Sequence, residues 1–345
     1  MRSSYWVLGI GYWVISSLLV DGRVAAQDIH YSQFYSSPLT LNPALTGAFE
    51  GQYRFVGNER RQWGSITLPY VYETFGLSAE MKQPFKALPD FAAGLAVYRD
   101  KAGDSEFGTL QINLSGAYSI RMNSDSTQFL TIGLQSGMTQ RKINYNKLTF
   151  DEQWNGYKYD GSLDGNETFD REQRLYSNLN LGLSYRGKFG ERNAFLFGAS
   201  WFNITKPTQS FYSDNIIKLD RRLHFHATAK LKMAEKFDLI PGISGMGQGT
   251  YREYLFGTNL KHIMSNEPYK YRAVYFGGWL RYGDAGYLMV GMDYNTWHVG
   301  LSYDFNYSNL RPASLGRGGF EIAVIYILRN LLPERVPYKV CPAFI

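Results

Sequence analysis

Apolar and polar side chains alternate one by one through long stretches of the sequence after residue 50, and this pattern limits the fold more than any other feature. Leu110, Ile112 and Leu114, for example, alternate with Gln111 and Asn113. Successive side chains of a β-strand point to opposite faces of a sheet, so this alternation predicts a strand with one apolar and one polar face. The same pattern recurs at residues 175–186, 222–232 and 297–306. The sequence therefore predicts an all-β chain.

Two all-β architectures fit such a pattern: a soluble sandwich with an apolar core, and a membrane barrel whose apolar face meets lipid. A tilted strand needs about 9 to 11 residues to cross a bilayer, and many of the alternating segments have about that length. Strands of soluble proteins average about five or six residues. The chain also contains 27 Tyr and 35 Gly but only 19% charged residues, which is typical of aromatic strands joined by flexible turns. We predict a transmembrane antiparallel outer-membrane β-barrel.

The barrel is predicted to occupy residues 51–330 and to have about 14 strands, an even number, as bacterial single-chain barrels require. The expected strands lie near residues 52–60, 71–81, 90–99, 107–121, 127–140, 173–186, 193–203, 220–232, 236–243, 251–262, 271–281, 286–293, 297–306 and 318–328. Most connections after even-numbered strands are short, whereas the longest, residues 142–172, follows an odd-numbered strand. Long external loops and short periplasmic turns are usual in such barrels, so we expect the long loop outside the cell.

Prolines and glycines mark the less regular parts of this pattern. Pro241 lacks the N–H that a strand ladder needs and predicts a bulge or an edge in the ninth strand. The glycine-rich run at residues 242–249 is predicted to be a mobile external hairpin, since neither a helical pattern nor a Lys-Ser/Thr step follows it as in a phosphate loop. The turns at residues 81–89 and 263–270 each carry a proline and are either rigid turns or docking knobs.

Residues 1–26 have the features of a signal peptide. An apolar run follows Arg2, and the small residues Val24, Ala25 and Ala26 stand at the spacing that signal peptidase requires. We expect cleavage after Ala26 and localisation in the outer membrane; an uncleaved membrane anchor is the alternative. The single cysteine, Cys341, excludes an intrachain disulfide. It lies in residues 331–345, which we expect to form a periplasmic tail.

Residues 27–50 follow neither the helical nor the strand period, although they are rich in rings and prolines. These rings need burial, and the nearest shelter before the first strand is the inner mouth of the barrel. We predict that residues 29–47 fold against that mouth or enter the lumen as a plug, with bends at Pro38 and at the Asn42-Pro43 step. The marker residues of this segment are Tyr31, Gln33, Phe34, Pro38, Asn42, Pro43 and Gly47.

Candidate chemistry is sparse elsewhere in the chain. His224 and His226 stand two apart on one strand face, which suits either a metal site or a polar wall, and two ligands favour the wall. The net charge of +6 is spread without a basic block, so we expect no nucleic-acid partner. No arrangement of nucleophile, base and acid rises above chance, so we predict a non-enzyme without a cofactor or a small-molecule substrate.

The long loop concentrates acidic and aromatic residues. It is interpreted in three ways: a solvated cap, a calcium site without the spacing of an EF-hand, or a surface that binds a partner protein. The candidate partner-binding residues are Trp154, Tyr157, Tyr159, Asp160, Asp164 and Phe169.

Five stretches of this chain resemble the PorP/SprF family of outer-membrane proteins of the type IX secretion system in Bacteroidota. They are "IHYSQFYSSPLTLNPALTGAF" (29–49), "YRFVGNERRQW" (53–63), "KLTFDEQ" (147–153), "GGFEIAVIY" (318–326) and the terminal "CP" (341–342). The first stretch is the most specific, because several residue types recur in order.

The resemblance implies a non-enzymatic barrel that supports the export or surface attachment of a secreted protein such as an adhesin, in some members with a link to gliding motility. Its implied partners are other secretion-system components, the secreted protein and outer-membrane lipid. A passive or ligand-selective channel is the main alternative, and a soluble periplasmic binding protein is a third.

Overall fold

The computed structural model of the 345-residue chain describes residues 29–62, 71–103, 105–165, 170–213, 216–267, 270–308 and 316–328. The predicted signal peptide, its cleavage site after Ala26, the predicted tail at residues 331–345 and Phe169 lie outside the described residues. Within the described residues, no helix is long and apolar enough to cross a membrane.

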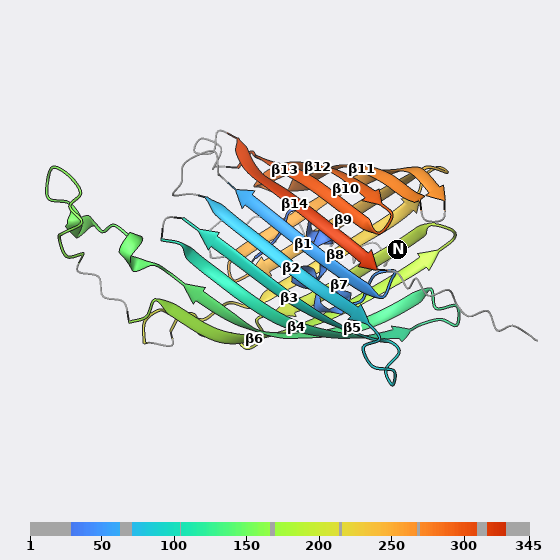
Figure 1. Cartoon of the computed structure of the whole chain (residues 1–345), viewed down its shortest axis with the longest axis horizontal. Coiled ribbons are helices and arrows are strands. Elements are labelled where there is room, and N and C mark those ends of the chain that lie inside the picture. Colours follow the sequence, from blue (N-terminus) through green and yellow to red (C-terminus); the bar gives the residue numbers. More distant parts are fainter. Residues whose placement is uncertain are drawn as a thin grey trace, which may run out of the picture.

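The described residues form a closed antiparallel barrel of fourteen strands, which confirms the predicted fold class. Each strand pairs with its neighbours in the sequence, and β1 pairs with β14, with Tyr53 opposite Leu328, to close the cylinder (Figure 1). The strands are β1 (Tyr53–Gln62), β2 (Tyr72–Lys82), β3 (Phe91–Ala102), β4 (Phe107–Arg121), β5 (Gln128–Lys142), β6 (Gln173–Phe189), β7 (Asn193–Phe202), β8 (Arg222–Lys232), β9 (Phe237–Gln248), β10 (Tyr251–Glu267), β11 (Lys270–Arg281), β12 (Ala285–Tyr294), β13 (Trp297–Asn306) and β14 (Arg317–Leu328).

The two faces of the wall follow the alternation in the sequence. On β4, Ile112 and Leu114 are exposed on the outer face, whereas Asn113 is buried on the inner face. On β8, Phe225 faces outward, and its two neighbours, His224 and His226, are buried inside. An outer face of apolar side chains is what a barrel in a bilayer requires.

The glycine-rich run at residues 242–249 corrects one prediction. Gly242 to Gln248 belong to β9, and the reversal to β10 needs only Gly249 and Thr250. A glycine at an outward position supplies no apolar side chain, so the alternation of apolar and polar residues is lost from the sequence. A strand with several glycines therefore has the composition that is typical of a turn. The bulge or edge predicted at Pro241 is not found. β9 is paired on both sides, and its register with β8 is the same before and after Pro241, although the pairs between Thr228–Gly242 and Leu231–Leu239 are interrupted.

The two ends of the barrel differ. At the turn end, even-numbered strands connect to the next strand through short turns such as residues 190–192 and 295–296. The loop end carries both short reversals, such as that between β9 and β10, and the two longest connections, residues 143–172 and 203–221. The first of these two projects far from the barrel at the left of Figure 1. The predicted turn at residues 263–270 is shorter than expected, because β10 continues to Glu267.

Candidate functional site

Residues 29–50, called the luminal segment from here on, form three short turns: η1 (Phe34–Ser36), α2 (Pro38–Leu41) and η2 (Pro43–Leu45). Both bends predicted from proline are present, because Pro38 and Pro43 each occupy the first position of a turn. Asn42 caps η2, since its Oδ1 accepts a hydrogen bond from the backbone N–H of Ala44 at 2.8 Å.

The luminal segment is buried against inward-facing side chains of the wall. All seven of its marker residues are buried: Tyr31, Gln33, Phe34, Pro38, Asn42, Pro43 and Gly47. Eight backbone–backbone hydrogen bonds lie within the segment, mostly in its turns, and its other buried polar groups need partners in the wall. Wall residues supply them at three levels.

The first level lies toward the loop end, at the buried carboxylate of Glu321 on β14. Its two oxygens accept the backbone N–H groups of Ser32 at 2.7 Å and of Gln33 at 2.9 Å. Tyr287 on β12 donates its hydroxyl to the carbonyl of Ser32 at 2.7 Å. Arg60 on β1 donates to the carbonyl of His30 at 3.2 Å. The segment is thus held here through its main chain.

A buried network of charges surrounds this first level. Arg60 lies 3.1 Å from Asp304 and 4.0 Å from Glu321, and Arg281 lies 3.5 Å from Asp304. The hydroxyl of Ser32 donates to Asp304 at 2.9 Å and accepts from Arg281 at 2.9 Å. Charges buried at this depth are tolerated only when they are paired and hydrogen-bonded, so the segment completes the network.

The second level, in the middle of the segment, centres on Asn42. Its Nδ2 donates to the strand carbonyls of Leu183 at 3.0 Å and Ala199 at 3.2 Å, and lies 3.1 Å from His226 Nε2. Ser200 on β7 donates to the carbonyl of Leu41 at 2.8 Å. His226 is therefore a partner of the segment. Within the described residues, no group of three or more His, Cys, Asp or Glu side chains could hold a metal ion.

The third level lies toward the turn end. Arg54 and Glu80 form a two-bond ion pair, with both N–O distances 2.7 Å. Glu80 also accepts the backbone N–H of Gly47 at 3.0 Å, and Arg54 donates to the carbonyl of Leu45 at 3.1 Å. Lys82 donates to the carbonyl of Phe49.

Glycines in the wall make room for the segment. A Cβ atom added at Gly133 would lie 2.3 Å from the backbone of Pro43 and Ala44, and one added at Gly182 would lie 2.0 Å from Asn42 Oδ1. At Gly300 the added atom would lie 2.4 Å from Gln33 Oε1. These distances are below any real contact, so the inner surface of the wall is shaped to the segment at these positions.

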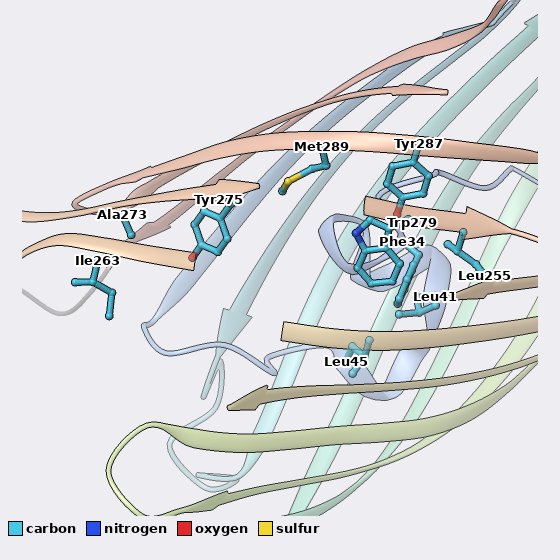
Figure 2. Packing of buried hydrophobic residues seen from close by; sticks show 10 residues of the cluster. All are labelled: Phe34, Leu41, Leu45, Leu255, Ile263, Ala273, Tyr275, Trp279, Tyr287 and Met289. Atoms are coloured by element: carbon cyan, nitrogen blue, oxygen red, sulfur yellow. The ribbon is translucent and has the colours of Figure 1, made fainter. Parts of the chain in front are cut away.

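Part of the inner wall is apolar, which the sequence reasoning did not foresee. Phe34 and Leu41 pack against Trp279 and Tyr287, which come from β11 and β12 (Figure 2). The rings of Phe34 and Trp279 meet edge-on at 5.4 Å, and those of Trp279 and Tyr287 stack at 6.0 Å. This patch takes up the apolar side chains of the segment.

The connection at residues 203–221 folds against inward-facing residues at the loop end. Phe211 lies edge-on to Phe107 at 6.2 Å, and Arg141 lies 5.1 Å from the Phe107 ring. The side chain of Arg141 also donates a hydrogen bond to the side chain of Gln209.

Two small cavities lie beside the luminal segment. Each has a volume of about 20 Å³, which is room for about one water.

The long loop places its predicted binding residues differently. Trp154, Tyr157 and Tyr159 are exposed, and Tyr157 retains 94% of its accessible surface. Trp154 and Tyr159 face each other across a β-bridge. The carboxylate of Asp160 accepts bonds from Ser162, which lowers the pKa of Asp160 and uses that carboxylate in a local turn. Asp164 is exposed in the same loop.

Sequence reasoning did not single out the charged wall residues Arg54, Glu80, Asp304 and Glu321 as site residues. The signal was present, because each stands at an inward position of an alternating strand, where an ion needs a partner. The luminal segment also brings together three stretches quoted for the family resemblance, since Ser32 and Gln33 meet Glu321, and His30 meets Arg60.

These features define a class of protein: an outer-membrane β-barrel of fourteen strands, with an ordered N-terminal segment bound inside. The family comparison identifies it further. The model of the type IX secretion system membrane protein PorP/SprF matches residues 23–326, and the chain belongs to this family.

Comparisons with individual proteins add little. No curated protein matches the sequence. Among solved structures, the chain is similar to the Ralstonia pickettii toluene transporter TbuX, with 10% identity, a TM-score of 0.48 and coverage of 89% of this chain and 96% of that one. It is also similar to the CymD monoaromatic hydrocarbon channel, with 10% identity, a TM-score of 0.47 and coverage of 89% and 95%. A Pseudomonas aeruginosa FadL homologue has 10% identity, a TM-score of 0.44 and coverage of 83% and 92%. The fold assignment rests on the strand pairing of this chain itself.

Proposed function

We propose that this protein is a non-enzymatic component of the type IX secretion system that supports the export or cell-surface attachment of a partner protein such as an adhesin. Gliding motility is one process that such attachment would serve. The observation that carries the proposal is the luminal segment, whose main chain is bound by the wall at three levels. A lumen occupied in this way suits a docking component better than a channel, and the segment acts as a plug.

The loop end supplies the surface for the partner. Exposed aromatic side chains beside charged residues are the usual anchors of protein interfaces. Trp154, Tyr157 and Tyr159 are exposed and meet this description. The loop that carries them projects away from the barrel (Figure 1). The turn end, where Phe85 and Leu88 are exposed, faces the other secretion-system components in the periplasm.

The test replaces Trp154, Tyr157 and Tyr159 together with alanine in the full chain. Partner proteins are captured from crosslinked outer membranes and quantified, together with the amount retained at the cell surface. We expect at least a tenfold loss of the surface partner, because the anchors supply most of the interface energy.

The matched control is the double variant Ile216→Ala/Ile217→Ala, which removes exposed apolar side chains from the other long connection at the loop end. It should leave the surface partner in place. Equal retention by the triple variant and the wild type would exclude the long loop as the docking surface.

The processing of the chain belongs to the same proposal. Residues 1–26 are the cleaved signal peptide, residues 27–50 the plug, residues 51–330 the barrel, and residues 331–345 a periplasmic tail. Amino-terminal sequencing of protein purified from outer membranes tests the first of these assignments. It should begin at Gln27, and a chain that begins at Met1 would show that residues 1–26 remain as an anchor.

A further inference from the structure

An apolar groove of about 1280 Å³ crosses the outer wall over β6 to β10. Its floor consists of small residues at outward positions on three neighbouring strands: Ala199 on β7, Ala227 on β8, and Gly245 and Gly247 on β9. Larger apolar side chains form its walls, including Phe197, Leu223, Phe225, Ile243 and Phe256. The volume exceeds the ~300 to 1,000 Å³ of common small-molecule sites.

The groove opens toward the lipid and is separate from the lumen. The wall residues Phe225 and Ile243 are each 60% exposed, which places the open side on the outer face. His226 and Met246, which also border the groove, are 3% and 4% exposed because they point into the filled lumen. In a membrane, such a groove is filled by the acyl chains of lipids.

Two arginines stand at the loop end of the groove. Arg252 pairs with Gly247, and its side chain lies over that glycine, 3.3 Å from where a Cβ atom would be. Leu223 pairs with Gly247 from the other side, so Arg221, two residues earlier on the same face, stands at the same end. Because β9 carries Gly247 here, no side chain of β9 itself separates the two arginines.

Both guanidinium groups are exposed and keep donor capacity for a ligand. Arg221 lies 5.2 Å from the Trp201 ring and donates to the carbonyl of Ile204 at 3.1 Å. Arg252 donates to the carbonyls of Gly249 and Tyr251 at 2.8 Å and 2.7 Å. Among the described residues, neither arginine forms an ion pair, although the carboxylate of Asp220 lies beside Gly249.

We propose that this groove binds a phosphate-bearing membrane lipid, with its acyl chains over Ala227 and Gly245 and its phosphate between Arg221 and Arg252. Arginine is the side chain best suited to phosphate, because its planar group presents several N–H donors in a fixed geometry. Trp201 at the same end suits the boundary between hydrocarbon and headgroups. The site does not depend on the proposed role in secretion.

The test measures lipid retention by the full-length protein purified in detergent and stripped of lipid. Two probes with the same acyl chains are added separately: dipalmitoylphosphatidylglycerol and dipalmitoylglycerol, which lacks the phosphate. Native mass spectrometry then gives the fraction of protein that carries each probe. We expect the phosphate-bearing probe to be retained at least tenfold better than the other.

Two variants locate the site. Arg221→Ala/Arg252→Ala should reduce retention of the phosphate-bearing probe at least tenfold, and Ala227→Phe, which fills the floor, should reduce retention of both probes. The control is Arg61→Ala, because Arg61 is also exposed on the outer face at the loop end but is paired with Glu73 at 3.4 Å. This control should behave as the wild type.

Three retention results would overturn the proposal. These are equal retention of the two probes by the wild type, unchanged retention by the double arginine variant, and an equal loss in Arg61→Ala. A dimer peak that disappears in Ala227→Phe would also overturn it, since a second copy of the chain would then occupy the groove. The electrophoretic mobility of every variant is measured before and after heating. A shift equal to that of the wild type shows that the variant barrel is folded.

Discussion

The luminal segment and the long loop are the two irregular, ring-rich parts of this barrel, and they are ordered in opposite ways. The luminal segment is buried, and its carbonyl and N–H groups are bonded to strands as distant in sequence as β14. The long loop is exposed and satisfies its backbone locally: Asn155 Oδ1, for example, accepts the N–H groups of Tyr157 and Lys158, each at 3.0 Å. Aromatic rings in an irregular stretch of sequence therefore do not decide between burial and exposure. What decides is whether the barrel wall offers the stretch partners.

The comparison has an energetic consequence. A group that the wall binds cannot be removed without leaving a buried partner unsatisfied, whereas water replaces a lost partner in the loop. Substitutions in and around the luminal segment should therefore destabilise the barrel, and comparable substitutions at exposed positions should not.

The largest effect is expected for Glu80→Ala. It removes the partner of the buried Arg54 and the acceptor of the Gly47 N–H, and should lower the free energy of unfolding by about 3 to 5 kcal/mol. Glu73→Ala breaks an exposed ion pair on the same two strands, Arg61–Glu73. This variant should change the free energy of unfolding by less than about 1 kcal/mol. Urea unfolding in detergent measures both. Similar losses in the two variants would contradict the burial argument.

The next effect is expected for Gly133→Ala. Its new methyl group would collide with the backbone of Pro43 and Ala44, so the segment must shift, at about 1 to 3 kcal/mol. Protease cleavage within residues 29–50 of the folded barrel reports the shift. At Gly278 on the outer face, the nearest atom would be 4.0 Å from the new methyl group, so Gly278→Ala should remain protected. Full protection of Gly133→Ala would show that the wall is not shaped to the segment there.

An effect of about the same size is expected for Asn42→Ala, which deletes the donor to Leu183 and Ala199 and the cap of η2. The loss should be about 1 to 3 kcal/mol, since buried polar groups are left without partners. Asn155→Ala in the long loop also removes an asparagine that caps a turn, but at an exposed site. Its unfolding curve should overlay that of the wild type, and a shift as large as that of Asn42→Ala would remove the distinction between the two regions.

The smallest effect concerns the base of the long loop. The carboxylate of Glu106 accepts hydrogen bonds from Lys101 and Lys147. These bonds lower the pKa of Glu106 to about 2, and the bond from Lys101 has the larger effect. A lowered carboxylate pKa stabilises the folded form above its ordinary titration range, and the contribution is lost as the pH falls toward 2. Protease cleavage of the loop should therefore rise in acid in the wild type and depend less on pH in Glu106→Gln. Identical pH profiles would exclude this anchor.

Sequence reasoning predicted the barrel because alternation is a local signal, and each strand carries its own, as β4 and β8 show. It failed at Gly245 and Gly247, where an outward position without a side chain resembles a turn. It also predicted that the luminal segment needs burial, since its rings and prolines are visible in the sequence. Its partners were not predictable, because a contact such as Ser32–Glu321 depends on the closure of the whole barrel.

The central claim is that the luminal segment blocks the lumen of the barrel. Planar-bilayer conductance tests this claim most directly. The full chain is compared with a variant that lacks residues 29–47, after both show the heat-dependent mobility of a folded barrel. The account predicts no steady conductance for the full chain and stable open channels for the variant. Stable channels in the full chain, or a folded variant that stays silent, would contradict it.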